Sequence, residues 1–142
     1  MCKEDIKVSS LTYEELSGYT LGQSDEHIPL FSEVLRLVDG RVPLLVELKG
    51  EDLNGELCDI AFEHLDLYGG AFCVESFNPI LIATVKKKRP SYVRGQLVTK
   101  LKKEDTAQPF IIRFLLSHMM LNLLSRPHFI ASRVTAGQID LI

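Results

Sequence analysis

The stretch PLLVELKGED, residues 43–52, has the pattern of a strand that is buried along most of its length and charged at its end. Four uncharged residues precede Glu47, and Lys49 follows two positions later. An apolar run of this length between a proline and a glycine is typical of a strand covered on both faces, as in the parallel sheets of α/β proteins. Carboxylate and ammonium groups are rare in such strands unless a partner or a site requires them.

Helices and strands alternate on both sides of this stretch. The residues TYEE, 12–15, match a capping box, and residues 31–38 carry apolar side chains at helical spacing. Asn78 and Pro79 form an N-cap and first-turn pair for another helix. The sequence predicts further strands over residues 71–77, 91–98 and 128–132, and further helices within residues 54–70, 79–88 and 109–124.

This alternation, with short connections, implies βαβ crossovers and an α/β fold with a parallel sheet, either doubly wound or closed into a barrel. The chain has no G-x-G-x-x-G motif after a strand and no P-loop, so the sequence does not predict a nucleotide site. With 142 residues, of which 46% are hydrophobic and 25% charged, it has the composition of one globular domain.

Charge and cysteine content exclude several classes of protein. The net charge of −3 argues against a nucleic-acid partner, and the basic runs at 86–89 and 100–103 are typical of solvated helix ends or loops. Three cysteines without metal-ligand spacing favour a reducing, cytoplasmic location over a disulfide or zinc framework. The N-terminus lacks an apolar signal region. Residues 109–124 are too short and too polar for a membrane span.

Residues two apart in a strand point the same way, so Glu47 and Lys49 share one face while Val46 and Leu48 share the other. The apolar pair suits the side covered by helices. In a barrel, the two charges would then face the lumen near the carboxyl end of the strand, where α/β proteins build sites. A carboxylate there can bind a hard cation and a lysine can bind a phosphate. The alternative is an ion pair that closes the mouth of the barrel.

Several separated segments resemble the glycerophosphodiester phosphodiesterase family. They are VSSLTYEELSGY (8–19), IPLFSEVLRLVDGRVPLLVELK (28–49), VESFNP (74–79), YVRGQLV (92–98) and RPHFIAS (126–132). The resemblance covers roughly residues 7–132 and implies a fragment of a (β/α)8 TIM barrel, with about four parallel strands equivalent to the fourth to seventh of eight. The domain prediction is a partial family domain over residues 1–142, in which residues 134–142 match the family poorly.

The resemblance implies a metal-dependent hydrolase of lipid metabolism that converts glycerophosphodiesters to glycerol 3-phosphate and an alcohol. Glu47 matches a family carboxylate that binds the divalent cation, calcium or magnesium. Lys49 matches the neighbouring basic residue, a partner for a phosphate or a carboxylate at the mouth of the barrel. Ser76 and Phe77 match a strand-ending pair that can line the substrate site, although a buried Phe and a strand-ending Ser would give the same pattern. Arg94 could meet an anionic substrate or cap a strand.

The family's HRG motif, acidic pair and HD motif do not occur in this sequence. Its four histidines do not match the two that transfer protons in the family, and solvent exposure or a core hydrogen bond is the simpler interpretation of each; they are His27, His64, His118 and His128. One carboxylate and one lysine cannot supply a three-ligand cation site, an acid and a base. We therefore expect no catalytic residues and no hydrolysis in this chain alone, because it would be a truncated part of the family domain.

Two other interpretations stay open. The chain could be a non-catalytic half-barrel that serves as a binding or interaction module. Its unpaired strand edges and uncovered lumen face would then favour a homo-oligomer. It could also be an unrelated small doubly wound domain, which the order of the motifs makes the least favoured of the three.

Overall fold

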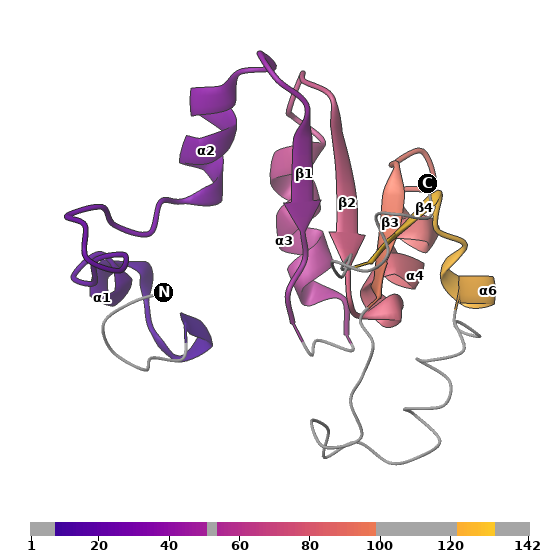
Figure 1. Ribbon diagram of the computed structural model, residues 1–142, viewed down its shortest axis with the longest axis horizontal. Coiled ribbons are helices and arrows are strands. Elements are labelled where there is room, and N and C mark those ends of the chain that lie inside the picture. Colours follow the sequence, from indigo (N-terminus) through magenta and orange to yellow (C-terminus); the bar gives the residue numbers. More distant parts are fainter. Residues whose placement is uncertain (1–7, 51–53, 99–121, 133–142) are drawn as a thin grey trace, which may run out of the picture. The chain divides into compact units, whose positions relative to one another are not determined.

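The computed structural model describes residues 8–50, 54–98 and 122–132 (Figure 1). The chain divides into two compact units, Met1–Asp39 and Gly40–Ile142. The first contains the short 3-10 helix η1 (Val8–Ser10) and the helices α1 (Tyr13–Leu16) and α2 (Phe31–Val38). The second contains a sheet and the remaining described helices, and it carries every residue that the sequence motifs single out as a site.

The helix ends of the first unit follow from local hydrogen bonds. At α1 the predicted capping box is confirmed, because the Glu15 N–H donates to Thr12 Oγ1 at 3.3 Å and the Thr12 N–H donates to Glu15 Oε2 at 2.8 Å. At α2 the N–H of Leu30 donates to Glu33 Oε2 at 3.0 Å. The helix ends at Val38, because the following residue, Asp39, has a left-handed φ of 46° that breaks the helical path.

The second unit is a four-stranded parallel sheet in the order β1-β2-β3-β4 (Figure 1). Its elements are β1 (Leu44–Glu47), α3 (Glu56–Leu65), β2 (Phe72–Ser76), α4 (Pro79–Lys88), β3 (Arg94–Val98), α6 (Asn122–Ser125) and β4 (Phe129–Ser132). The predicted alternation of helices with parallel strands is therefore confirmed. Each strand lies beside the next one in sequence. This order occurs both in a barrel and at the edge of an open sheet.

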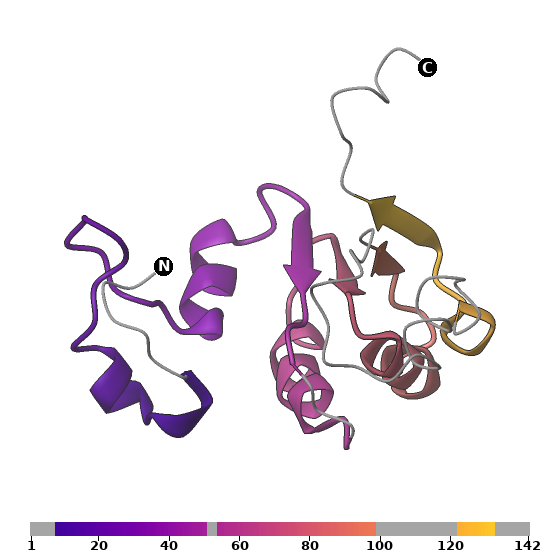
Figure 2. The same cartoon turned by 60° about the horizontal axis from the view of Figure 1, so that its bottom comes forward.

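All described helices of this unit lie on one side of the sheet (Figure 2). Sequential order explains the arrangement, since right-handed crossovers that always step in the same direction put every helix on the same face. The core fills the space between these helices and the sheet. The apolar side chains with 0% exposure among the described residues come from α3, β2 and α4; they are Cys58, Val74, Leu81, Ile82 and Val85.

The strand register defines what each face carries. Val46 pairs with Val74, which is fully buried on the helix side, and Leu48 just beyond β1 is also buried. The opposite face carries the alternate residues, and one row across it is Glu47, Glu75, Gly95 and Phe129. Leu45 lies on this opposite face and is 61% exposed. The predicted division of β1 into an apolar helix side and a face with Glu47 is thus confirmed.

Several predicted boundaries shift. β1 ends at Glu47 and β2 at Ser76, so Lys49 and Phe77 lie just beyond their strands, and β3 begins only at Arg94. The sequence predicts a helix within residues 109–124. Residues 109–121 lie outside the described residues, and the rest of this range forms the start of α6. The two described cysteines, Cys58 and Cys73, are not joined by a disulfide. Within the described ranges, no helix is long and apolar enough to cross a membrane.

Candidate functional site

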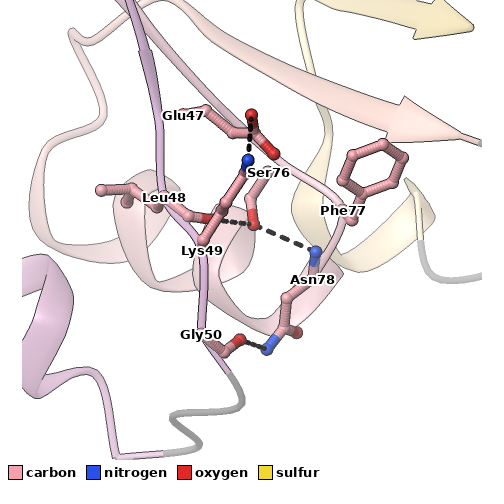
Figure 3. A pocket seen from close by; sticks show the side chains of 7 residues that line it. All are labelled: Glu47, Leu48, Lys49, Gly50, Ser76, Phe77 and Asn78. Atoms are coloured by element: carbon pink, nitrogen blue, oxygen red, sulfur yellow. Dashed lines mark hydrogen bonds and ion pairs between the residues drawn. The ribbon is translucent and has the colours of Figure 1, made fainter. Parts of the chain in front are cut away.

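An open pocket of about 380 Å³ lies at the carboxyl ends of β1 and β2 (Figure 3). All four site residues predicted from the sequence line it, and the full set is Glu47, Leu48, Lys49, Gly50, Ser76, Phe77 and Asn78. The pocket forms here because the segments that follow β1 and β2 both leave the sheet at this edge. The carboxyl edge of a parallel sheet is the usual place for a site in α/β folds.

Asn78 fixes the shape of this edge. As the predicted N-cap of α4, it accepts a hydrogen bond at Oδ1 from the Ile80 N–H at 2.9 Å, and Pro79 occupies the first turn. Its Nδ2 donates to the carbonyl of Gly50 at 3.2 Å (Figure 3). One side chain therefore both starts the helix and holds the segment after β1 against the segment after β2.

Ser76 performs a similar structural task. It is 1% exposed; its hydroxyl donates to the Leu48 carbonyl at 2.6 Å and accepts from the Asn78 N–H at 3.0 Å. Gln96 adds to this by donating from Nε2 to the carbonyls of Ser76 and Phe77 at 2.9 and 3.1 Å. Because its hydroxyl is already bonded on both sides, Ser76 is placed to position the pocket rather than to contact a ligand directly.

Glu47 and Lys49 lie side by side, as their spacing predicts. Lys49 Nζ is 3.4 Å from Glu47 Oε2, and the side chain of Lys49 extends toward Glu47 in Figure 3. The two side chains are 69% and 29% exposed, respectively. An ion pair this exposed contributes only about 0–1 kcal/mol, so Lys49 can turn toward another anion at little cost. The exposed ring of Phe77 forms an apolar wall beside them.

Glu75 is a residue of this edge that sequence reasoning missed. The register of β1 and β2 pairs Glu75 with Glu47 on the same face, and Glu75 is only 7% exposed. Burial, together with the nearby charge of Glu47, raises the pKa of the Glu75 carboxyl. A signal was present, since a carboxylate stands at or next to the end of two consecutive apolar strands. Only the register shows that the two carboxylates are neighbours.

The carboxylates of Glu47 and Glu75 are the side chains at this edge that could hold a divalent cation. Glu47 Oε1 is buried and, within the described part of the chain, has no hydrogen-bond partner. Calcium and magnesium prefer oxygen ligands, and magnesium is usually held by one or two carboxylates together with water and substrate phosphates. A cation between Glu47 and Glu75 would offset their repulsion. In the ranges that the structure describes, His, Cys, Asp and Glu residues form no group of three or more that could hold a metal.

The other candidates lie elsewhere and are bonded locally. Arg94 is 7% exposed on the helix side, where its guanidinium donates to the carbonyls of Ser125, Pro90 and Tyr92 at 3.2–3.3 Å. His128 Nδ1 accepts from the Arg94 N–H at 3.2 Å. These contacts join β3 to its neighbours, so Arg94 has a structural role here.

The remaining histidines give no pair near the pocket. His27 Nδ1 lies 3.1 Å from the carbonyl of Tyr19 in the first unit. His64 is partly buried on α3, and His118 lies outside the described residues. Among the described residues, the pocket lining contains no histidine.

Comparisons with family models, with curated proteins and with solved structures find no match for this chain. The residues at the carboxyl edge of the sheet are therefore the indication of its function. Those residues offer two adjacent carboxylates, an exposed ammonium group and an apolar ring beside an open pocket. Such a set suits a cation together with a phosphate-bearing ligand.

Proposed function

We propose that this chain is part of a metal-dependent glycerophosphodiester phosphodiesterase, with its four strands as the fourth to seventh of a TIM barrel. The reaction class is hydrolysis of a phosphoric diester to glycerol 3-phosphate and an alcohol. One observation carries the proposal: the residues that the sequence motifs single out in two separate segments, Glu47 with Lys49 and Ser76 with Phe77, line the same pocket.

In this proposal each side chain has a distinct task. Glu47 binds calcium or magnesium, and Glu75 beside it adds a second carboxylate. Lys49 binds the phosphate of the substrate, which its weak pair with Glu47 permits. Phe77 packs against the glycerol or alcohol part. The bound cation would polarise a phosphoryl oxygen. A general acid and base would have to come from elsewhere in a complete barrel, so the chain alone is expected to bind without hydrolysis.

Cation binding is the first test of the proposal. Calcium or magnesium is titrated by calorimetry into the wild type, E47Q and E63Q, the last a control on the exposed face of α3. Binding should raise the free energy of unfolding by about 2.7 kcal/mol at a cation concentration 100 times Kd. E47Q should lose both the heat and the stabilisation, and E63Q should keep both. Equal binding by E47Q and wild type would exclude Glu47 as a ligand.

Phosphate binding tests the role of Lys49. With the cation present, glycerol 3-phosphate should bind the wild type, and K49M should weaken binding about three- to tenfold, equivalent to about 0.6–1.4 kcal/mol. K87M, a change at an exposed lysine of α4, should leave binding unchanged. Incubation with glycerophosphocholine and either cation should release no glycerol 3-phosphate. Turnover that E47Q abolishes would overturn the expectation that the chain alone is inactive.

A second candidate function is a non-catalytic half-barrel that serves as an interaction module and forms a homo-oligomer through its strand edges. It is supported by the sheet face opposite the helices, where Leu45 is 61% exposed. Exposed apolar strands of this kind favour association. Retained association of the chain after loss of cation binding would favour this function over the first.

A further inference from the structure

Among the described elements of Gly40–Ile142, helices cover one face of the sheet, and none covers the other. Parallel sheets occur with both faces covered, yet the described helices of Gly40–Ile142 all lie on one side (Figure 2). Apart from Glu47 and the buried Glu75 and Gly95, the opposite face is apolar. Its apolar side chains are the exposed Leu45 and the half-buried Cys73, Leu97, Phe129 and Ala131. A face of this composition needs an apolar partner.

Among the described strands, the two edges of the same sheet also have no further partner. In the described strands, β1 pairs only with β2, and β4 pairs only with β3. On β1 the N–H groups of Leu44 and Leu48 donate toward β2, to Ala71 at 2.9 Å and Glu75 at 2.8 Å. Because alternate N–H groups of a strand point to opposite sides, the N–H groups of Leu45 and Glu47 point away from β2, to the other edge of β1. Each edge can therefore accept one further parallel strand.

We propose that the partner is a second copy of this chain, and that β1 of each copy pairs in parallel with β4 of the other. A two-fold axis along the strands keeps all strands parallel and makes the two seams identical. The resulting sheet has eight strands, the number at which side chains fill a barrel interior. Closure covers both apolar faces and removes all four open edges at once, which separate association at one edge would not do.

Closure would also complete the site. The carboxyl ends of all eight strands would surround one mouth, so the partner would supply a second Glu47, Glu75 and Lys49. One copy offers two adjacent carboxylates, whereas a three-ligand cation site needs more. This consequence for the cation rests on the proposed function, while the seam rests on the strand order alone. Since closure gathers four carboxylates, calcium or magnesium should strengthen the dimer.

The seam is tested by the mass of the full chain in solution, measured by light scattering over a range of concentrations. L45K places a charge on the uncovered face, and V42K, at a residue 56% exposed just before β1, is the matched control. Wild type and V42K should be dimers, and L45K should raise the dimer Kd at least 100-fold. A wild-type monomer, or an L45K dimer as tight as V42K, would overturn the proposal.

Disulfide trapping tests the seam without relying on a destabilising variant. In the C2S/C73S background, L45C and A131C stand on β1 and β4, about 14 Å apart across three strand spacings of one sheet. A disulfide needs Cα atoms within about 7 Å, so a bond between these positions must join two copies. Mild oxidation should give a covalent dimer. The pair L67C and A131C, which uses the exposed Leu67 beyond α3, should give none. Equal trapping by both pairs would overturn the seam.

The two proposals can fail separately. A dimer that is trapped through L45C and A131C but binds no cation would refute the proposed function and support the seam. A monomer that binds the cation through Glu47 would refute the seam and support the proposed function. A monomer in which L45K lowers the free energy of unfolding as much as a core substitution would show that the chain covers this face itself, which also refutes the seam.

Discussion

Replacing Gly95 with alanine tests the pairing of β3 with β4 at a single atom. The two strands pair Gly95 with Phe129, and the ring of Phe129 lies over the glycine. A Cβ added at position 95 would lie 2.2 Å from Cε2 and Cζ of that ring, whereas ordinary contact begins at 3.4 Å. The ring would therefore have to move away, or the two strands would have to separate.

The expected cost follows from this overlap. Inserting an atom into a filled space costs about 1–3 kcal/mol. Gly95 is not among the described residues with positive φ, so its backbone conformation suits alanine. Without the ring, alanine should then stabilise the strand by about 0.5–1 kcal/mol, because glycine loses more backbone entropy on folding. G95A should thus lower the free energy of unfolding in the wild type and raise it in F129A.

Urea unfolding followed by far-ultraviolet circular dichroism measures this double-mutant cycle, with the slope checked for constancy. G69A serves as the control, since a Cβ at Gly69 would meet no atom within 4 Å. G69A should change the free energy of unfolding by the same amount in the wild type and in F129A. If G95A changes the free energy of unfolding in the same direction in both backgrounds, the ring does not lie over Gly95 and the pairing of β4 is wrong.

Two further changes test the second unit. Arg89 Nη2 and the Tyr92 hydroxyl each donate to Asp66 at 2.6 Å, and these bonds lower the pKa of the Asp66 carboxyl to about 2. The pKa of an aspartate in the unfolded chain is about 3.9. The stability that the bonds contribute is therefore present above that pH and is lost as the pH falls toward 2. The urea midpoints of wild type and D66N should therefore converge over that range, and a constant difference would contradict the assignment. S76A should lower the free energy of unfolding by about 1–3 kcal/mol, because the buried Leu48 carbonyl loses the hydrogen bond that the Ser76 hydroxyl donates to it. It should also weaken calcium binding measured by calorimetry.

The parts of the fold that depend on local interactions could be predicted from the sequence. The start of α4 follows from Asn78 and Pro79, whose side chain and ring act on the next few residues alone. The capping box at Thr12 is equally local. The strand positions follow from apolar runs bounded by breakers, although their ends moved by one to three residues because hydrogen bonding to the neighbouring strand, rather than composition, decides where a strand stops.

The candidate site was also predictable only where it depends on local interactions. Glu47 and Lys49 are two residues apart, and alternation within one strand brings their side chains to the same face. Glu75 reaches that face next to Glu47 only because β2 pairs with β1 in one particular register. A shift of one residue would turn Glu75 to the helix side, and the sequence of β2 does not determine that register by itself.

The pairing of Glu47 with Glu75 opposes folding at neutral pH, which is a reason to connect it with binding. Burial and the charge of Glu47 raise the pKa of Glu75, so the folded state binds its proton more tightly than the unfolded state does. The fold is then most favoured below the unfolded pKa, about 4.3, and loses stability as the pH rises through the raised pKa. E75Q would remove this loss, and so would a cation held between the two carboxylates. A chain that keeps both carboxylates at one strand register retains a repulsion that a positively charged ligand would relieve. The carboxyl edge of β1 and β2 is where such a ligand has access.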